Sequence, residues 1–149
     1  MKLCLVASTG GHLLQLVSLK QAWGEHERFW VTFPKVDAQT LLASERVIWA
    51  YHPTNRNLKN LLKNLWLAWK VLRQERPDAV ISTGAGVGVP FIWMGRLLGM
   101  HTIFIESITF IDHLSLSGRL VSPAVHRLFV QWPELAARHR QAAYRGKVL

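Results

Sequence analysis

Residues 1–19 read MKLCLVASTGGHLLQLVSL, and this stretch decides the fold class. An apolar run from Leu3 to Ala7 stops at two glycines, after which leucine and valine recur at three- and four-residue steps. The run is typical of a buried strand and the recurrence of a helix, so the stretch predicts a strand, a glycine turn and a helix.

The rest of the chain repeats this alternation. Further strands are expected at residues 27–33, 46–51, 77–83, 101–107 and 127–131, and helices at 57–75, 91–99 and 133–141. Pro77 and Gly99 are the expected helix stops. Strands that alternate with helices predict an α/β, Rossmann-like, doubly wound parallel sheet, and 149 residues suffice for a single domain over 1–149.

Composition restricts the class of partner. Lysine and arginine outnumber aspartate and glutamate by 18 to 9, so an anionic partner or surface is expected. Seven tryptophans favour a membrane interface, and no motif for nucleic-acid binding is present. The single cysteine and the short apolar run at the start favour the cytoplasmic side. We expect neither a metal nor a cofactor.

Two expected strand-to-helix turns are rich in glycine. Glycine lets the backbone approach a ligand closely, and the N–H groups that open the following helix favour phosphate. Neither turn matches a dinucleotide or P-loop fingerprint, and packing of a helix on a sheet explains the second turn equally well. The candidate phosphate- or acceptor-binding residues are Ser8, Thr9, Gly10 and Gly11 in the first turn and Gly84, Gly86 and Gly88 in the second.

Several motifs together resemble a known family. ASTGGHLLQL (7–16) and STGAGVGVPFIWMGRLLGMHTIFIES (82–107) resemble the N-terminal, acceptor-binding half of MurG-like glycosyltransferases. LSLSG (114–118), VQWP (130–133) and a closing Tyr-x-Gly resemble the PssD or Alg14-like subunit of split glycosyltransferases. One position departs from the pattern, because Phe110 stands where such proteins commonly carry an arginine.

The resemblance implies half of a GT-B enzyme. A separate catalytic subunit would bind the UDP-sugar, and this subunit would recruit it to the cytoplasmic face of the inner membrane. There the pair would act on a polyprenyl-diphosphate-linked acceptor in exopolysaccharide or capsule assembly. Two alternatives stay open: a membrane scaffold that contributes no site residue, and a free-standing nucleotide-binding protein.

His12 and Glu106 are the candidate catalytic residues. His12 follows the first glycine turn, where an imidazole could accept a proton from an acceptor hydroxyl. Glu106 ends the strand at 101–107 and could orient His12 or bind a sugar hydroxyl. A purely structural role for His12, or an ion pair of Glu106 with Arg96 or Arg119, is the alternative.

The helix at 57–75 and the segment after it are the candidate membrane contacts. Leu58, Leu61, Leu62, Leu65, Trp69 and Leu72 form an apolar stripe that we expect to face the core. Cations interleaved with a tryptophan suit an anionic leaflet on another side of the helix, although a merely solvated face would also carry cations. The candidates are Lys59, Lys63, Trp66, Lys70 and Arg73. Phe91 and Trp93 form a second segment that could insert into the membrane.

The C-terminal segment, from Val130 to Leu149, is expected to dock the catalytic subunit. A free terminus of one small domain has no evident need for these large apolar residues, and tryptophan and tyrosine are favoured anchors. The alternative is that the tail packs on its own sheet. The candidates are Trp132, Tyr144, Gly146, Val148 and Leu149.

Overall fold

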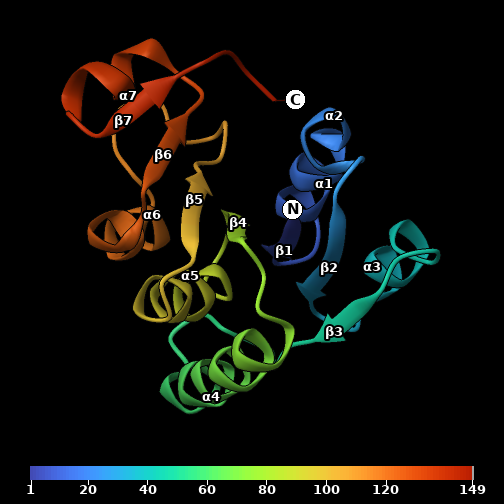
Figure 1. Ribbon diagram of the computed structural model, residues 1–149. Helices are drawn as coiled ribbons and strands as arrows, with labels where there is room; N and C mark the ends of the chain where they lie inside the picture. The colour runs from blue at the N-terminus through green and yellow to red at the C-terminus, as the bar shows by residue number, and fades with distance from the viewer. Residues whose placement is uncertain (149) are drawn as a thin grey trace.

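The computed structural model describes residues 1–148, and these contain a seven-stranded sheet (Figure 1). The spatial order is β3-β2-β1-β4-β5-β6-β7, and each neighbouring pair is parallel. The order changes direction between β1 and β4, as in Rossmann-like folds, which confirms the predicted class. The strands are β1 (Lys2–Ala7), β2 (Glu27–Thr32), β3 (Val47–Trp49), β4 (Ala79–Gly84), β5 (His101–Ile105), β6 (Arg127–Val130) and β7 (Ala142–Tyr144).

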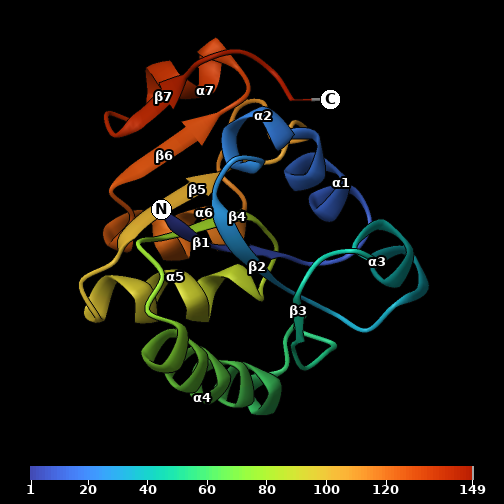
Figure 2. The same ribbon diagram turned by 45° about the vertical axis from the view of Figure 1, so that its right-hand side comes forward.

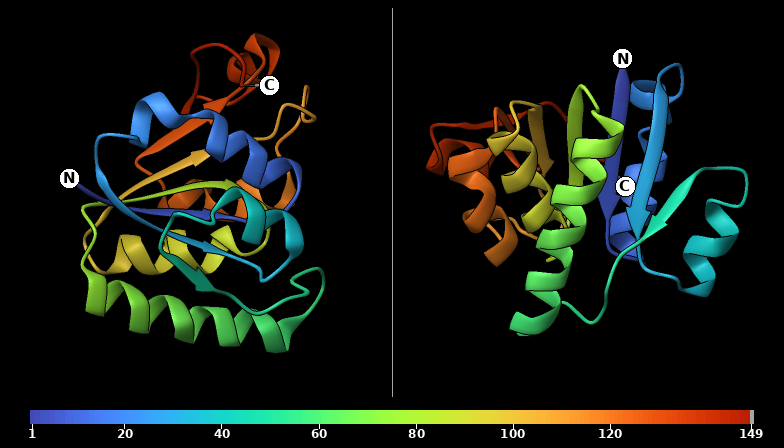
Figure 3. Two further views of the ribbon diagram at one scale, coloured as in Figure 1. Left: turned by 90° about the vertical axis from the view of Figure 1, so that its right-hand side faces the viewer. Right: turned by 60° about the horizontal axis from the view of Figure 1, so that its bottom comes forward.

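Helices cover both faces of this sheet. The pair α4 and α5 lies on one face and α1 on the other (Figures 2 and 3). A single 3-10 turn, Ser122–Ala124, follows α6. The helices are α1 (Gly11–Ser18), α2 (Lys20–Trp23), α3 (Val36–Leu41), α4 (Leu58–Glu75), α5 (Gly88–Leu97), α6 (Leu116–Val121) and α7 (Pro133–Arg138).

Strand β1 shows why the opening run is continuously apolar. Cys4 and Val6 belong to the core on the α4 and α5 side, and Leu3 and Leu5 belong to the core on the α1 side. A parallel strand covered on both faces needs an apolar residue at every position rather than at alternate ones. Cys4 is accordingly a buried thiol, and burial raises its pKa.

The apolar stripe of α4 does not face the core, so that prediction is wrong. Leu58, Leu62 and Trp69 are 70%, 58% and 37% exposed, and of the stripe only Leu72 is fully buried. The helix packs instead through Asn64, Ala68, Val71 and Leu72. Asn64 bonds to both backbone groups of Tyr51, its Oδ1 accepting from the N–H and its Nδ2 donating to the carbonyl at 2.9 Å each.

Several other helices and strands differ from the expected ones, either in their boundaries or because they were not predicted. The short helices α2 and α3 were not predicted, and α5 begins at Gly88 rather than at residue 91. The expected terminal helix ends at Arg138, and the strand β7 follows it. Pairing of Leu128 to Val130 with Ala142 to Tyr144 outweighs the helical propensity of this alanine- and arginine-rich segment.

Candidate functional site

A pocket of about 890 Å³ opens where the strands end and the helices α4, α5 and α6 begin. This is the edge at which parallel α/β sheets bind ligands. The pocket brings together four of the predicted site residues, and its wall combines polar loops with leucines. It is lined by His12, Thr54, Asn55, Arg56, Asn57, Leu58, Leu61, Thr83, Gly84, Ala85, Gly86, Val89, Phe104, Glu106, Phe110, Ser115, Leu116, Ser117 and Leu120.

His12 is held in one orientation by a reciprocal pair of hydrogen bonds to Thr83. The ring Nδ1 lies 2.8 Å from the carbonyl oxygen of Thr83, and the Thr83 hydroxyl donates to the carbonyl of His12 at 2.6 Å. A carbonyl can only accept, so Nδ1 carries the proton of the neutral ring. The lone pair is therefore on Nε2, where a base would need it.

The second glycine turn fits closely around that ring. Gly84 has a φ of +101°, and a Cβ there would lie 3.1 Å from Nδ1 of His12. A Cβ at Gly86 would lie 3.1 Å from the hydroxyl oxygen of Thr54. Gly88 serves packing instead, because a Cβ would lie 2.3 Å from Oγ of Ser82. Gly84 and Gly86 line the pocket, and Gly88 brings α5 onto β4.

The first glycine turn presents His12 but does not itself line the pocket. The N–H of Gly10 donates to the carboxylate of Asp37 at 2.7 Å, so an internal anion already occupies this group. The Ser8 hydroxyl accepts from the N–H of Ala85 at 3.3 Å and ties the two turns together. Thr9 and Gly11 lie outside the lining residues as well.

Glu106 is a buried carboxylate, 2% exposed, that directly follows β5 and reaches Ser115, the N-cap of α6. Its Oε2 accepts from the backbone N–H and from the hydroxyl of Ser115, both at 2.9 Å, and Oε1 accepts from the N–H of Ser107 at 3.0 Å. Within residues 1–148 it forms no ion pair with Arg96 or Arg119 and no hydrogen bond with His12. It fixes the loop before α6, and the expectation that it orients His12 is wrong.

The segment from Thr54 to Leu58 lines the pocket but was not predicted as part of the site. Arg56 supplies the only lysine or arginine among the residues that line the described pocket, and its φ is +47°. Asn57 follows and caps α4, its side chain accepting from the N–H of Asn60 at 3.0 Å. A polar run immediately before a long helix was the available signal, because such a run places side chains at a helix N-terminus.

One side of the pocket wall is apolar and open to solvent. Leu58 and Leu61 from α4 and Leu116 and Leu120 from α6 are 70%, 39%, 67% and 49% exposed. Phe110 also lines this wall. The pocket therefore combines polar groups, among them His12 and Arg56, with an apolar side formed by two helices.

The predicted membrane residues on α4 are exposed, and one of those on α5 is not. Trp66 is 63% exposed and stacks on Trp69 with ring centroids 5.3 Å apart. Phe91 is fully buried in the core, so its assignment as a membrane contact is wrong. Trp93 is half-buried, and its indole N–H donates to the carbonyl of Leu120 at 2.8 Å. Lys59, Lys63, Lys70 and Arg73 are all exposed.

The C-terminal segment packs on its own sheet, contrary to the preferred expectation. The Trp132 indole donates to the carbonyl of Ile108 at 2.6 Å, and Tyr144 lies half-buried in β7. The N–H of Val148 donates to Oε1 of Gln131 at 2.6 Å. Leu149 lies outside the described residues. Chain ends often fray, but parallel pairing with β6 holds this one.

A second, apolar pocket of about 280 Å³ lies between that tail and the sheet. Ile81, Ile103, Ile105 and Phe129 form its sheet side, and Gly146 and Val148 lie on the tail side. In the part of the chain that the structure describes, no helix is long and apolar enough to cross a membrane.

Comparison with known proteins gives the family. The sequence pattern of "Oligosaccharide biosynthesis protein Alg14 like" matches residues 46–148. The chain belongs to the Alg14-like family. The UDP-N-acetylglucosamine transferase subunit ALG14 of Mus musculus is 25% identical over 181 aligned positions, which cover 100% of this chain and 83% of the mouse protein. The corresponding subunit of Homo sapiens is 30% identical over 94 residues, 59% of this chain and 44% of the human protein.

Solved structures share the fold of this Alg14-like chain at low identity. MurG of Acinetobacter baumannii superposes with a TM-score of 0.79 at 17% identity, covering 97% of this chain and 45% of MurG. UDP-GlcNAc 2-epimerase from Neisseria meningitidis gives 0.76 at 14% identity, covering 99% and 47%. The chain thus spans less than half of either structure.

Proposed function

We propose that this Alg14-like chain is the acceptor-binding subunit of a two-chain glycosyltransferase. The observation that carries the proposal is the amphipathic pocket at the strand ends. An oriented imidazole and a guanidinium lie at its polar end, and exposed leucines form its other side. A sugar linked through diphosphate to a polyprenol has the same division into a polar, anionic head and an apolar tail.

The polar end can hold the head of such an acceptor. Arg56 stands before the first turn of α4, where the helix dipole adds to its charge in attracting a diphosphate. Gly86, in the turn before α5, lines the same pocket. The tail would leave between Leu58 and Leu61 of α4 and Leu116 and Leu120 of α6.

His12 would then act as the general base. As the acceptor hydroxyl attacks the anomeric carbon of the UDP-sugar, its proton passes to Nε2 of His12, and the bond from that carbon to the UDP oxygen breaks. UDP leaves, and a glycosidic bond forms. Thr83 keeps the proton on Nδ1 so that Nε2 can accept.

The UDP-sugar would come from a separate catalytic subunit, as the word "subunit" in the names of the ALG14 relatives suggests. We propose that this partner docks on the apolar pocket beside the tail, where Gly146 and Val148 are placed. Trp132 and Tyr144 would support the tail from inside rather than contact the partner. Deleting residues 145–149 should abolish co-purification of the two chains while the circular dichroism spectrum stays unchanged.

We propose peripheral attachment to the inner leaflet through the exposed face of α4, and a role in exopolysaccharide or capsule assembly. Trp66 and Trp69 suit headgroup depth, and the neighbouring lysines suit an anionic leaflet. From the names of the relatives we expect the partner to use UDP-N-acetylglucosamine.

The decisive experiment measures sugar transfer by the co-expressed pair. His12→Gln should lower turnover by at least about 100-fold, because a general base contributes that much or more. His101→Gln, at the opposite edge of the sheet, is the matched control and should leave turnover unchanged. Arg56→Gln should raise the KM for the lipid acceptor. Normal turnover by the His12 variant would make the chain a scaffold without a site residue.

A further inference from the structure

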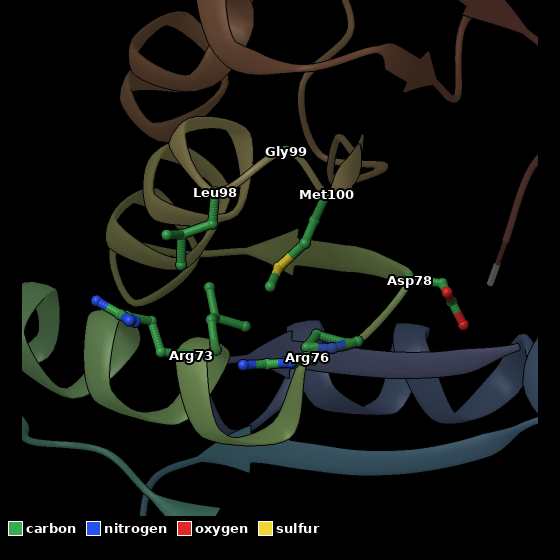
Figure 4. A pocket seen from close by; sticks show the side chains of 8 residues that line it. Arg73, Arg76, Asp78, Leu98, Gly99 and Met100 are labelled. Atoms are coloured by element: carbon green, nitrogen blue, oxygen red, sulfur yellow. The ribbon is translucent and has the colours of Figure 1, made fainter.

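A third pocket lies at the far end of α4, between the C-terminal ends of α4 and α5 (Figure 4). Its volume is about 380 Å³. The 18 residues of α4 place it roughly 27 Å along the helix from the candidate site. The lining residues are Leu72, Arg73, Arg76, Pro77, Asp78, Leu98, Gly99 and Met100.

This pocket has an apolar floor and a cationic rim. The side chains of Leu98 and Met100 both point toward α4, which carries Arg73 and ends at Arg76 (Figure 4). Asp78 points away from that floor. A ligand that satisfies both parts must carry a negative charge next to an apolar segment.

Neither guanidinium is neutralised from within the chain. Across residues 1–148, Arg73 and Arg76 form no ion pair and no side-chain hydrogen bond. The neighbouring carboxylate of Glu75 forms ion pairs with Lys2, at 2.9 Å, and with Arg46. Asp78 accepts from the backbone N–H of Lys2 at 2.7 Å. The two arginines are thus available to an external anion.

The two arginines also continue the exposed apolar line of α4. Leu62, Trp66, Trp69 and Arg73 follow one another at steps of four and three residues, which places them on one helix face, and Arg76 is the left-handed residue that ends the helix. The Arg73 guanidinium lies 5.3 Å from the centroid of the Trp69 ring. If the tryptophans lie at headgroup depth, the arginines lie at the depth of lipid phosphates.

We propose that this pocket binds the phosphate of an anionic phospholipid. The phosphodiester would lie between Arg73 and Arg76, and the first carbons of the lipid would lie on Leu98 and Met100. The proposal rests on the membrane attachment proposed above and adds a specific lipid site to it. One headgroup at this end and the acceptor at the other would fix the direction in which α4 lies on the membrane.

Vesicle binding tests the pocket against general charge attraction. Arg73→Lys combined with Arg76→Lys keeps the net charge but removes the guanidinium geometry, so affinity for phosphatidylcholine vesicles containing phosphatidylglycerol should fall about tenfold. Arg127→Lys with Arg140→Lys makes the same chemical change away from α4 and should have no effect. Equal affinity for both variants would overturn the lipid site, whereas failure of the unaltered chain to bind any vesicle would overturn the proposed membrane attachment.

A second measurement needs no membrane. With methyl-labelled methionine, the Met100 signal should shift on titration with monomeric short-chain phosphatidylglycerol and saturate well below the concentration at which inorganic phosphate acts. The Met94 signal, from the middle of α5, is the internal control. An unmoved Met100 signal, or equal affinity for inorganic phosphate, would overturn the assignment to a lipid.

Discussion

The two glycine-rich turns look alike in the sequence, yet they differ in what surrounds them. The turn at Gly10 and Gly11 is open, and a Cβ at either glycine would meet nothing within 4 Å. The turn from Gly84 to Gly88 is crowded by His12, Thr54 and Ser82. The open turn carries the imidazole to the pocket, and the crowded one forms the wall against which the imidazole rests.

The difference teaches that glycine density alone does not identify a phosphate loop. At the first turn the N–H of Gly10 is already bonded to Asp37, and none of its glycines lines the pocket. At the second turn two glycines line the pocket, and the third permits a helix to pack closely. The following changes test this contrast, starting with the largest expected effect.

Gly88→Ala should destabilise the fold by about 1–3 kcal/mol, because the added carbon overlaps the buried Ser82 side chain. Gly11→Ala is the matched change in the open turn. It adds a carbon to free space at a helical φ and should be neutral or stabilise by about 0.5 kcal/mol. Urea unfolding of both variants measures the difference, and similar losses would refute the contrast.

Thr83→Val should lower stability by about 1 kcal/mol and turnover by about tenfold, because the His12 carbonyl loses its donor and the ring loosens. Thr102→Val removes an equally buried hydroxyl, which donates to Ala124 at 2.7 Å at the other end of the sheet. This control should lose similar stability with full turnover. A parallel loss of turnover in both variants would make the Thr83 effect a general one.

A titration with acid tests the ends of β1 and β4 that lie opposite the two glycine turns. The titrating group there is the carboxylate of Glu75, which pairs with Lys2 and Arg46. Hydrogen bonds from Arg46 and then Lys2 lower the pKa of Glu75 from 4.5 to about 2. The folded carboxylate holds its charge more strongly than the unfolded one, so this stabilisation is complete above pH 4.5 and is lost as the pH falls toward 2. We expect the free energy of unfolding to fall by about 1 kcal/mol or less, because solvent screens the charge of the exposed Arg46.

Stability curves of the unaltered chain and of Glu75→Gln between pH 6 and pH 3 measure this contribution. The variant should show a shallower decline. Identical slopes would mean that other carboxylates govern acid unfolding.

Asp37→Ala should have the smallest effect, about 0.3–1 kcal/mol of stability, since it removes a carboxylate from the first turn of α3 and a bond to Gly10. Turnover should stay within about twofold, because neither group lines the pocket. A large fall in turnover would instead show that the open turn takes part in the site.

The sequence predicted the sheet because buried parallel strands leave a strong local signal. The runs around Leu5 and Val80 are apolar, and a glycine-rich turn follows each of them. The short α3 and the edge strand β7 were missed, because their formation depends on pairing and packing that no local pattern records. For the same reason the stripe on α4 was assigned to the wrong side.

The candidate site was only partly predictable. His12 lies in the first helical turn after β1 and Gly84 ends β4, and both were found by that position. Arg56 was missed, because its place in the pocket depends on the path of the loop between β3 and α4. Glu106 was found, but its partner in the structure is Ser115, nine residues later, rather than an arginine.

The bond between His12 and Thr83 spans a separation of 71 residues. The base is therefore oriented only in a chain whose central strands have already come together, and a fragment ending before β4 contains the histidine without its support. Catalytic competence would thus report on long-range assembly of the middle of the sheet. Peripheral changes at β3 or β7 would be tolerated by the chemistry even where they weaken the fold.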